Sequence, residues 1–295
     1  MAKIEQREID GPNNVGLFAL EGITKDSIIF REVPFYSFSS AKIMMHYMTS
    51  ETPTGNPILD AEIRELQLQI VLAHKKYNDQ GSTFNDKYPP EARVHLDRMA
   101  SIVAERGFQS ESNDVQEKWL ALHDAHKDVR IDTPVGIFGL TSEKGLSFNG
   151  KIGYCRGYDE SKKRYIVECS ESPTPKQEGI LLKKENLKTI SGVFRSNSFQ
   201  EGLFEKRCRM NHSCNSNTKT FSISQYNQLL GKDLIANHPN ECITIAKRDI
   251  NAGDELTGCY VNSPKTKSVD IRREELREKY RFECQCELCI KEDAV

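Results

Sequence analysis

The 295-residue chain lacks the features that would assign it to a membrane, a secretory route or a nucleic acid. Its apolar runs are far too short to span a bilayer. Residues 1–10 alternate apolar and charged side chains without an apolar core, so we expect no secretory signal. The formal net charge of −2 provides no global positive field. We therefore expect an intracellular protein, nuclear or cytoplasmic, with no membrane partner and no direct nucleic-acid signal.

A disulfide framework is also not expected, although the chain has nine cysteines, because thiols stay reduced inside cells. Six cysteines are scattered, whereas Cys284, Cys286 and Cys289 lie within six positions. Three clustered thiols can bind one zinc ion, which prefers four tetrahedral ligands at about 2.3 Å from sulfur. A catalytic zinc would keep the fourth position for water, and a structural zinc would take a distant Cys or His. The alternative is three unrelated thiols.

The alternation of strand-like and helix-like patterns predicts five segments. Residues 1–56 open with short β-prone runs. Residues 57–130 carry apolar side chains at helical spacing, and residues 131–190 hold several short strands with close turns, typical of a small SH3- or Tudor-like barrel. Mixed short elements fill 191–267, and a helix from Ser268 to about Arg281 opens the segment 268–295.

Three helices are expected in the second segment from the stripes Leu59, Ile63, Leu66, Ile70 and Ala73, then Leu96, Met99 and Val103, then Val115, Trp119, Leu122 and His126. In the third segment we expect the aromatic residues to form a core rather than a methyl-lysine cage, and the segment to brace the fold or bind a partner. These residues are Phe138, Phe148, Tyr154, Tyr158 and Tyr165.

Two polar motifs lie toward the C-terminus. The run Arg209-Met-Asn211-His-Ser-Cys214 is dense in hydrogen-bonding side chains, and by itself it also fits an exposed loop. The run Gly253-Asp-Glu-Leu-Thr-Gly-Cys-Tyr260 predicts a turn and a strand that ends on a tyrosine. By itself, it is also typical of a buried core tyrosine.

The order of the motifs carries more information than any one of them. Asn-His-Ser-Cys, then Gly-Asp-Glu-Leu with a later Tyr, then Tyr-x-Phe-x-Cys-x-Cys-x-x-Cys resembles the SET-domain protein methyltransferases, and most closely their SET-and-MYND branch. The likeness extends to the opening, Gly16-Leu-Phe-Ala with Glu32-Val-Pro, and to Asn197-Ser-Phe with Gly202-Leu-Phe. It covers roughly residues 9–40 and 193–290, about half the chain.

The resemblance implies an α+β fold: a β-rich SET fold split by the helices and the barrel, with a zinc-bound C-terminal tail (the post-SET tail). It implies that S-adenosylmethionine is the cofactor. Asn211 and His212 are then the cofactor-binding pair, backbone groups of Asn14, Gly16 and Leu17 hold the amino-acid end, and Phe282 packs on the adenine.

The same resemblance assigns catalysis to Tyr260 and the walls of a lysine channel to Phe199 and Tyr280. It implies that Cys214 joins Cys284, Cys286 and Cys289 in a structural Zn²⁺ site. The expected function is a protein-lysine N-methyltransferase whose partner is a protein or peptide carrying a lysine, from a histone or another protein. The alternative is a catalytically silent SET scaffold that recruits partners through the inserted barrel.

The chain departs from the family pattern at three places. Ser216 replaces a proline in the Asn-His-Ser-Cys loop. Asn13-Asn14-Val15 stands where Arg-Gly-x is usual, which leaves open how a side chain would contact the cofactor carboxylate. No Cys/His array for a MYND zinc module lies between the two SET halves.

Overall fold

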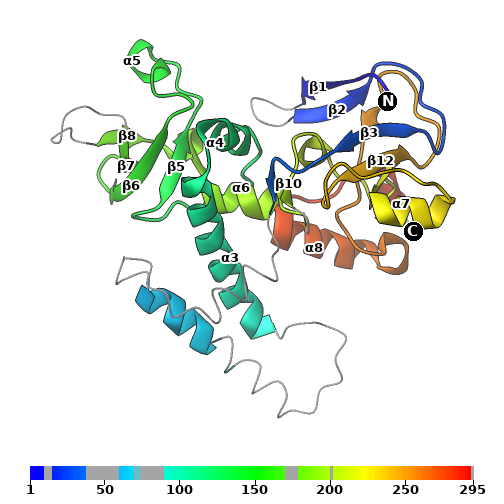
Figure 1. Cartoon of the computed structure of the whole chain (residues 1–295). Coiled ribbons are helices and arrows are strands. Elements are labelled where there is room, and N and C mark those ends of the chain that lie inside the picture. The colour runs from blue at the N-terminus through cyan, green and yellow to red at the C-terminus, as the bar shows by residue number, and fades with distance from the viewer. Residues whose placement is uncertain are drawn as a thin grey trace. The chain divides into compact units, whose positions relative to one another are not determined.

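The computed structural model describes residues 1–9, 15–37, 60–69, 72, 90–169, 179–199 and 202–293 (Figure 1). The chain forms two compact units. One unit comprises Met1–Ser37 and Asn113–Val295, and the other comprises Phe38–Ser112.

Two three-stranded antiparallel sheets bring the ends of the chain together in the first unit. β2 (Val15–Ala19) pairs with β1 (Ile4–Glu8) on one side and with β13 (Glu255–Leu256) on the other. β12 (Cys242–Ala246) pairs with β3 (Ile28–Glu32) and β11 (Thr218–Ser222). Since both sheets join N-terminal strands to strands after residue 217, the two predicted SET halves fold as one body.

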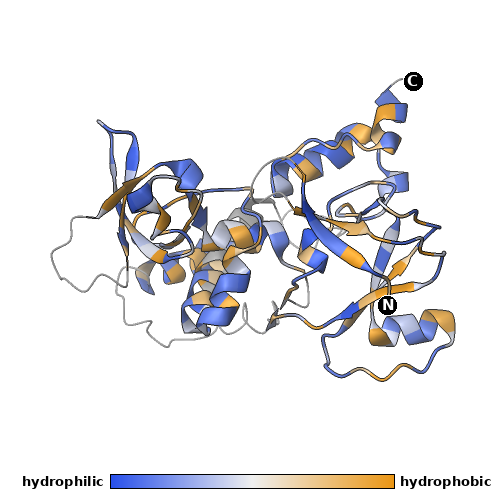
Figure 2. Cartoon of the chain, turned by 90° about the horizontal axis from the view of Figure 1, so that it is seen from above, coloured by the Kyte–Doolittle hydropathy of each residue, from blue (hydrophilic) through white to orange (hydrophobic). Residues whose placement is uncertain are grey.

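The core of this body is apolar and closely packed. Leu17, Ile29, Phe30 and Leu256 are each at most 1% exposed and belong to one cluster. Hydrophobic residues run through the strands beside the N-terminus in Figure 2. A two-stranded pair, β4 (Tyr36–Ser37) with β10 (Gly202–Leu203), completes the strands of this part.

The inserted β segment forms a five-stranded antiparallel sheet in the order β8-β7-β6-β5-β9. Its strands are β5 (Pro134–Ile137), β6 (Ile152–Asp159), β7 (Arg164–Cys169), β8 (Ile180–Leu182) and β9 (Leu187–Thr189). A short helix, α5 (Glu143–Leu146), and the turn η1 (Lys184–Asn186) lie in its connections. Within the described residues no β8–β9 pairing closes the sheet, so the SH3- or Tudor-like barrel stays a prediction.

The helices of the first unit link this sheet to the C-terminal tail. α6 (Ile190–Asn197) starts at the cap Thr189 and packs against α4 (Asn113–Leu120), β5 and α8 (Val269–Tyr280). The remaining elements are α7 (Ile223–Leu230), α9 (Glu287–Asp293), η2 (Arg207–Arg209) and η3 (Pro264–Thr266).

Two helix predictions can be compared in this unit. The C-terminal helix is confirmed: Ser268 caps α8, and Arg281 ends it in the left-handed region with φ 61°. The predicted stripe through Leu122 and His126 extends too far, because α4 ends at Leu120. The buried Lys188 ammonium donates to the carbonyls of Leu120 (2.8 Å) and Leu122 (3.0 Å), which satisfies carbonyls that a continued helix would use itself.

In the second unit, residues 60–69 are helical and α3 runs over Pro90–Ser110. Ile63, Leu66, Met99 and Ile102 form its core, which confirms two of the predicted helices. Leu59, Ile70 and Ala73 of the predicted stripe lie outside the described residues. In the described part of the chain, no helix combines the length and apolar character needed to cross a bilayer.

Candidate functional site

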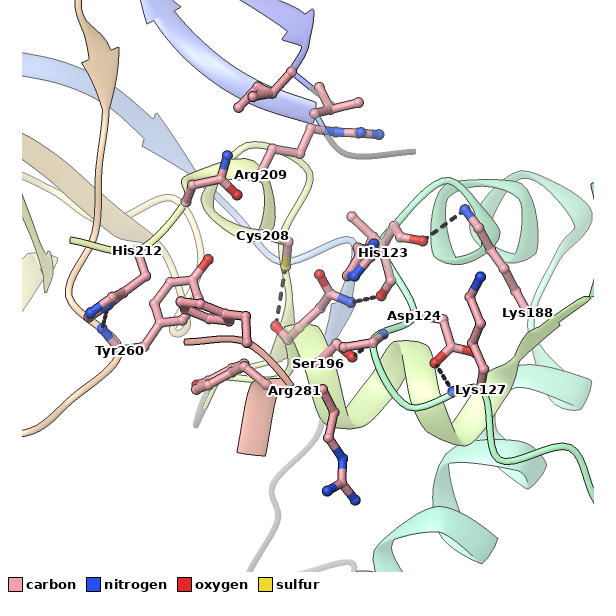
Figure 3. A pocket seen from close by; sticks show the side chains of 18 of the residues that line it. His123, Asp124, Lys127, Lys188, Ser196, Cys208, Arg209, His212, Tyr260 and Arg281 are labelled. Atoms are coloured by element: carbon pink, nitrogen blue, oxygen red, sulfur yellow. Dashed lines mark hydrogen bonds between the residues drawn. The ribbon is translucent and has the colours of Figure 1, made fainter. Parts of the chain in front are cut away.

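A cavity of about 1160 Å³ opens in the first unit (Figure 3). The loop 211–213, Tyr260 and the segment 280–286 form one side of its wall. Residues 121–125 and 185–186 contribute elsewhere, as do Ile9, which follows β1, and Val15, the first residue of β2. A volume of this size suits a ligand as large as a nucleoside derivative.

His212 is held by both of its ring nitrogens. The Tyr260 backbone N–H donates to Nδ1 over 3.0 Å, so the proton lies on Nε2, which donates to Cys214 Sγ over 3.2 Å. Burial, aided by the charge of Arg272, lowers the pKa of His212 to about 4 and keeps the ring neutral. The His212 side chain is therefore committed to the protein, and its main chain is the part left for a ligand.

The main chain around His212 supports this assignment. A parallel bridge joins it to Gly258 through two hydrogen bonds, Gly258 N–H to Asn211 O and Ser213 N–H to Gly258 O, each 2.9 Å long. Both bonds use the neighbours of His212. Among the described residues, its own N–H and C=O make no hydrogen bond.

Asn211 is oriented by an acidic neighbour. Its Nδ2 donates to Glu255 Oε1 over 2.7 Å, which leaves its Oδ1 as a free acceptor at the cavity wall. Gly16 makes room for this pair, since a Cβ at that position would lie 2.6 Å from Glu255 Oε1. Leu17 is 1% exposed in the core and does not line the cavity, and Asn14 lies outside the described residues.

Tyr260 lies among aromatic rings. Its hydroxyl donates to the carbonyl of Met210 over 2.6 Å, and its ring centroid is 4.6 Å from that of Tyr280 and 5.2 Å from that of His212. The Phe282 ring is 5.9 Å from His212. Burial raises the pKa of Tyr260, so the phenol stays neutral and its oxygen can still accept a hydrogen bond.

Phe199 is not brought to this group. Its ring stacks under the Arg207 guanidinium at 3.8 Å and meets Phe204 edge-on at 6.0 Å. It is not part of the cavity wall, whereas Tyr280 and Phe282 are. The sequence pattern could not separate these positions, because all three are aromatic residues near a functional motif.

The four predicted zinc ligands converge. The sulfurs of Cys214, Cys284, Cys286 and Cys289 all lie within 4.8 Å of one another, with Cys214 Sγ 3.9 Å from Cys284 Sγ and 3.6 Å from Cys289 Sγ. A tetrahedral zinc with 2.3 Å bonds to sulfur separates its ligands by about 3.8 Å. The spacing therefore fits one Zn²⁺ with four thiolates.

The charge around these thiols fits the same ion. Burial raises the pKa of Cys214, and it raises that of Cys284 to about 11, so these thiols ionise only with a cation beside them. A second cation is provided by Arg272, which is completely buried and donates Nη2 to Cys289 Sγ over 3.3 Å. Four thiolates leave no place for water, which is the arrangement of a structural site.

The comparison with protein families decides the classification. The model of the SET domain matches residues 14–261. The chain belongs to the SET-domain family. Its match therefore spans the insert as well as both SET halves.

Three relatives illustrate the likeness of this SET-domain chain to characterised proteins. Histone-lysine N-methyltransferase SET5 of Saccharomyces cerevisiae is 23% identical over an alignment of 343 positions, covering 99% of this chain and 61% of that protein. SET5 of Meyerozyma guilliermondii is 31% identical over 108 residues, 37% of this chain and 20% of the relative. Histone-lysine N-methyltransferase SMYD3 of Mus musculus is 34% identical over 92 residues, 31% and 18% respectively. The chain thus spans less than two thirds of each.

The SET-domain site includes two residues, Glu255 and Arg272, that were not among the predicted site residues. Glu255 stood within the Gly-Asp-Glu-Leu motif, so a signal for it was present. Arg272 had no signal, because its sulfur contact arises only when α8 packs on the tail.

A buried carboxylate, Asp124, organises the opposite wall and likewise had no signal. It accepts from the N–H groups of His126 (2.9 Å), Lys127 (2.8 Å) and Thr189 (2.7 Å), and from the Thr189 hydroxyl (2.9 Å). These bonds tie the segment after α4 to the start of α6.

Proposed function

We propose that the chain is an S-adenosylmethionine-dependent protein-lysine N-methyltransferase. The observation that carries the proposal is the Tyr260 hydroxyl, bound to the Met210 carbonyl beside Asn211 and His212, in an aromatic-walled cavity within a SET domain. The relatives named as histone-lysine methyltransferases support the same reaction.

The cavity has groups that suit the parts of the cofactor. The free main-chain N–H and C=O of His212 suit the hydrogen-bonding edge of adenine, and Phe282 offers a ring face beside them. Asn211 Oδ1 suits a donor such as the cofactor's ammonium group. When bound, S-adenosylmethionine supplies an activated methyl group on its sulfonium.

The residues of the chain then position the substrate amine. We propose that a lysine side chain enters alongside the Tyr260 and Tyr280 rings, which pack on each other and present aromatic faces that attract its cation. The apolar surroundings disfavour the ammonium form and lower the pKa of the lysine. The neutral Tyr260 hydroxyl and the Met210 carbonyl orient the amine, because in-line transfer depends mainly on alignment.

We further propose that a structural Zn²⁺ bound by Cys214, Cys284, Cys286 and Cys289 holds the tail in place. The Nε2–H of His212 donates to Cys214 Sγ, so a proposed cofactor-binding residue is hydrogen-bonded to a proposed zinc ligand. Loss of zinc would then release Tyr280 and Phe282 from the cavity wall as well as the cysteines.

The test has two steps. Isothermal titration calorimetry of the zinc-loaded full chain with S-adenosylmethionine is expected to show binding at one site. Incubation with a protein extract that includes histones, followed by mass spectrometry of peptides, is expected to show new methyl groups on lysine. No cofactor binding would refute the enzyme and leave the partner-recruiting scaffold, and the nuclear or cytoplasmic location stays a prediction.

A further inference from the structure

Arg209 projects into the cavity without a role in the site described above. It ends η2, which packs against β2, and it lines the cavity with Ile9, Val15 and Asn211. Figure 3 shows its side chain extending along the wall of the pocket on the side of the N-terminal strands, away from Tyr260.

Among the residues that the structure describes, the guanidinium of Arg209 has no partner of opposite charge. Its Nε is fully buried without a hydrogen-bond partner, and no carboxylate among the described residues forms an ion pair with Arg209. A buried charged donor left unpaired is costly, so such a group is expected to meet an anion when the site is filled. Its neighbour Arg207 differs, since that guanidinium stacks on the Phe199 ring.

The electrostatic surroundings of Arg209 also favour an anion. Lys188 lies near enough that, in addition to burial, the charge of Arg209 helps lower the lysine's pKa. Ile9, which follows β1, and Val15, the first residue of β2, line the cavity with apolar side chains. The Glu255 carboxylate also lines the cavity, but its Oε1 accepts from Asn211 Nδ2, so the Arg209 guanidinium is the group on this side that an anion would bind.

We infer that Arg209 binds the carboxylate at the amino-acid end of S-adenosylmethionine, an inference that rests on the function proposed above. That end of the cofactor is a zwitterion, and the cavity offers a matching pair of groups. Arg209 provides the cation for the carboxylate. Asn211 Oδ1, held in place by the bond from Asn211 Nδ2 to Glu255, provides the acceptor for the ammonium group. A guanidinium can donate two parallel hydrogen bonds to a carboxylate, which neither Ile9 nor Val15 could do.

This assignment also sets the direction of the cofactor in the cavity. Its carboxylate end would lie toward β2, and its adenine would lie toward Phe282 and His212. The sulfonium, between the two ends, would then face the Tyr260 side of the wall. Methyl transfer beside Tyr260 requires the same direction of the cofactor, although here the direction follows from Arg209.

The experiment removes the cation and the carboxylate separately. Calorimetry on the zinc-loaded full chain would compare wild type with Arg209→Met, each titrated with S-adenosylmethionine and with its decarboxylated analogue, which keeps the adenosine, sulfonium and amine. Arg209→Met is expected to raise the Kd of S-adenosylmethionine by about 10- to 100-fold, the range of a charge-assisted hydrogen bond or bidentate pair. The Kd of the analogue is expected to change by less than about 3-fold.

Matched variants separate a direct contact from a general field. Lys127→Met removes another cation of the same cavity, whose ammonium lies over the Phe138 ring, and it is expected to leave both affinities nearly unchanged. Arg209→Lys keeps the charge and is expected to recover part of the lost affinity. Zinc content and circular dichroism would verify the fold of each variant.

The outcomes distinguish a failure of the Arg209 assignment from a failure of the proposed function. An equal loss for both ligands, no loss for either, or the same carboxylate-dependent loss in Lys127→Met would overturn the assignment of Arg209 while leaving cofactor binding intact. A wild-type protein that binds neither compound would overturn the proposed function itself.

Discussion

Arg272 is expected to set the zinc affinity of the post-SET tail. Zn²⁺ with four thiolates carries a net charge of −2, and such a cluster is costly to bury without a cation nearby. Arg272 is completely buried, donates Nη2 to Cys289 Sγ over 3.3 Å and to Glu292 over 2.8 Å, and donates Nη1 to the Lys267 carbonyl over 2.7 Å. It is therefore fixed from several sides against the metal ligands.

The perturbation is Arg272→Met, which keeps the apolar stem and removes the charge. Loss of an outer-shell partner costs about 10- to 100-fold in metal affinity. At 1.4 kcal/mol for each ten-fold step, this corresponds to about 1.4–2.8 kcal/mol. The expected result is weaker zinc binding in that range, measured by competition with a chromophoric chelator.

Arg273→Met is the matched control on the same helix. Arg273 bonds the Cys284 carbonyl over 3.2 Å and forms ion pairs with Asp293 and Glu283, but it donates to no sulfur of the cluster. The zinc affinity of the Arg273→Met protein is expected to stay within about 3-fold of wild type. Equal effects of the two substitutions, or an Arg272→Met protein with wild-type zinc affinity, would refute the reasoning.

Three further substitutions test the cavity. Tyr260→Phe is expected to lower turnover by about 100-fold or more while leaving cofactor affinity nearly intact, and an unchanged rate would remove Tyr260 from catalysis. Gly16→Ala would push Glu255 aside and is expected to cost about 1–3 kcal/mol in the free energy of unfolding and to weaken cofactor binding, measured by urea denaturation and calorimetry. Asp124→Asn replaces an acceptor oxygen with a donor and is expected to lower the free energy of unfolding by about 2–3 kcal/mol. Asp128→Asn, at a half-exposed side chain, is the control. Equal melting curves for the two variants would contradict this expectation.

Much of the candidate site was predictable because its signals are local in the sequence. The cysteine tail has the close spacing of a metal site, and its sulfurs converge with that of Cys214 in the structure; the helix before it has a serine cap. The motif that ends on Tyr260 predicted a strand, which β13 confirms at Glu255–Leu256, although this strand ends before Tyr260. Each of these patterns depends on neighbours within about ten positions, so it can be read without knowing the fold.

Other predictions needed the tertiary structure. The sequence suggested that backbone groups up to Leu17 hold the cofactor, which stays a prediction; the structure adds that the Leu17 side chain is buried in β2, the central strand of its sheet. Phe199 was predicted to line the lysine channel, which stays a prediction; the structure shows its ring against the Arg207 guanidinium and outside the wall of the cavity in Figure 3. A residue near a motif can face either side of a strand or loop. The sequence pattern alone does not say which side faces the cavity.

The sequence by itself determined the family, and it predicted the kinds of ligand atom and the residue that would carry the chemistry. Tertiary structure decided the surroundings of these residues: the His212 ring is held by Tyr260 and Cys214, Gly16 leaves space for Glu255, the Nε of Arg209 is buried, and Arg272 is a completely buried cation. The reason is physical. Ligand type and short spacing are properties of neighbouring residues, whereas burial, hydrogen-bond partners and charge pairing depend on segments that meet only when β2 pairs with β13 and α8 packs on the tail.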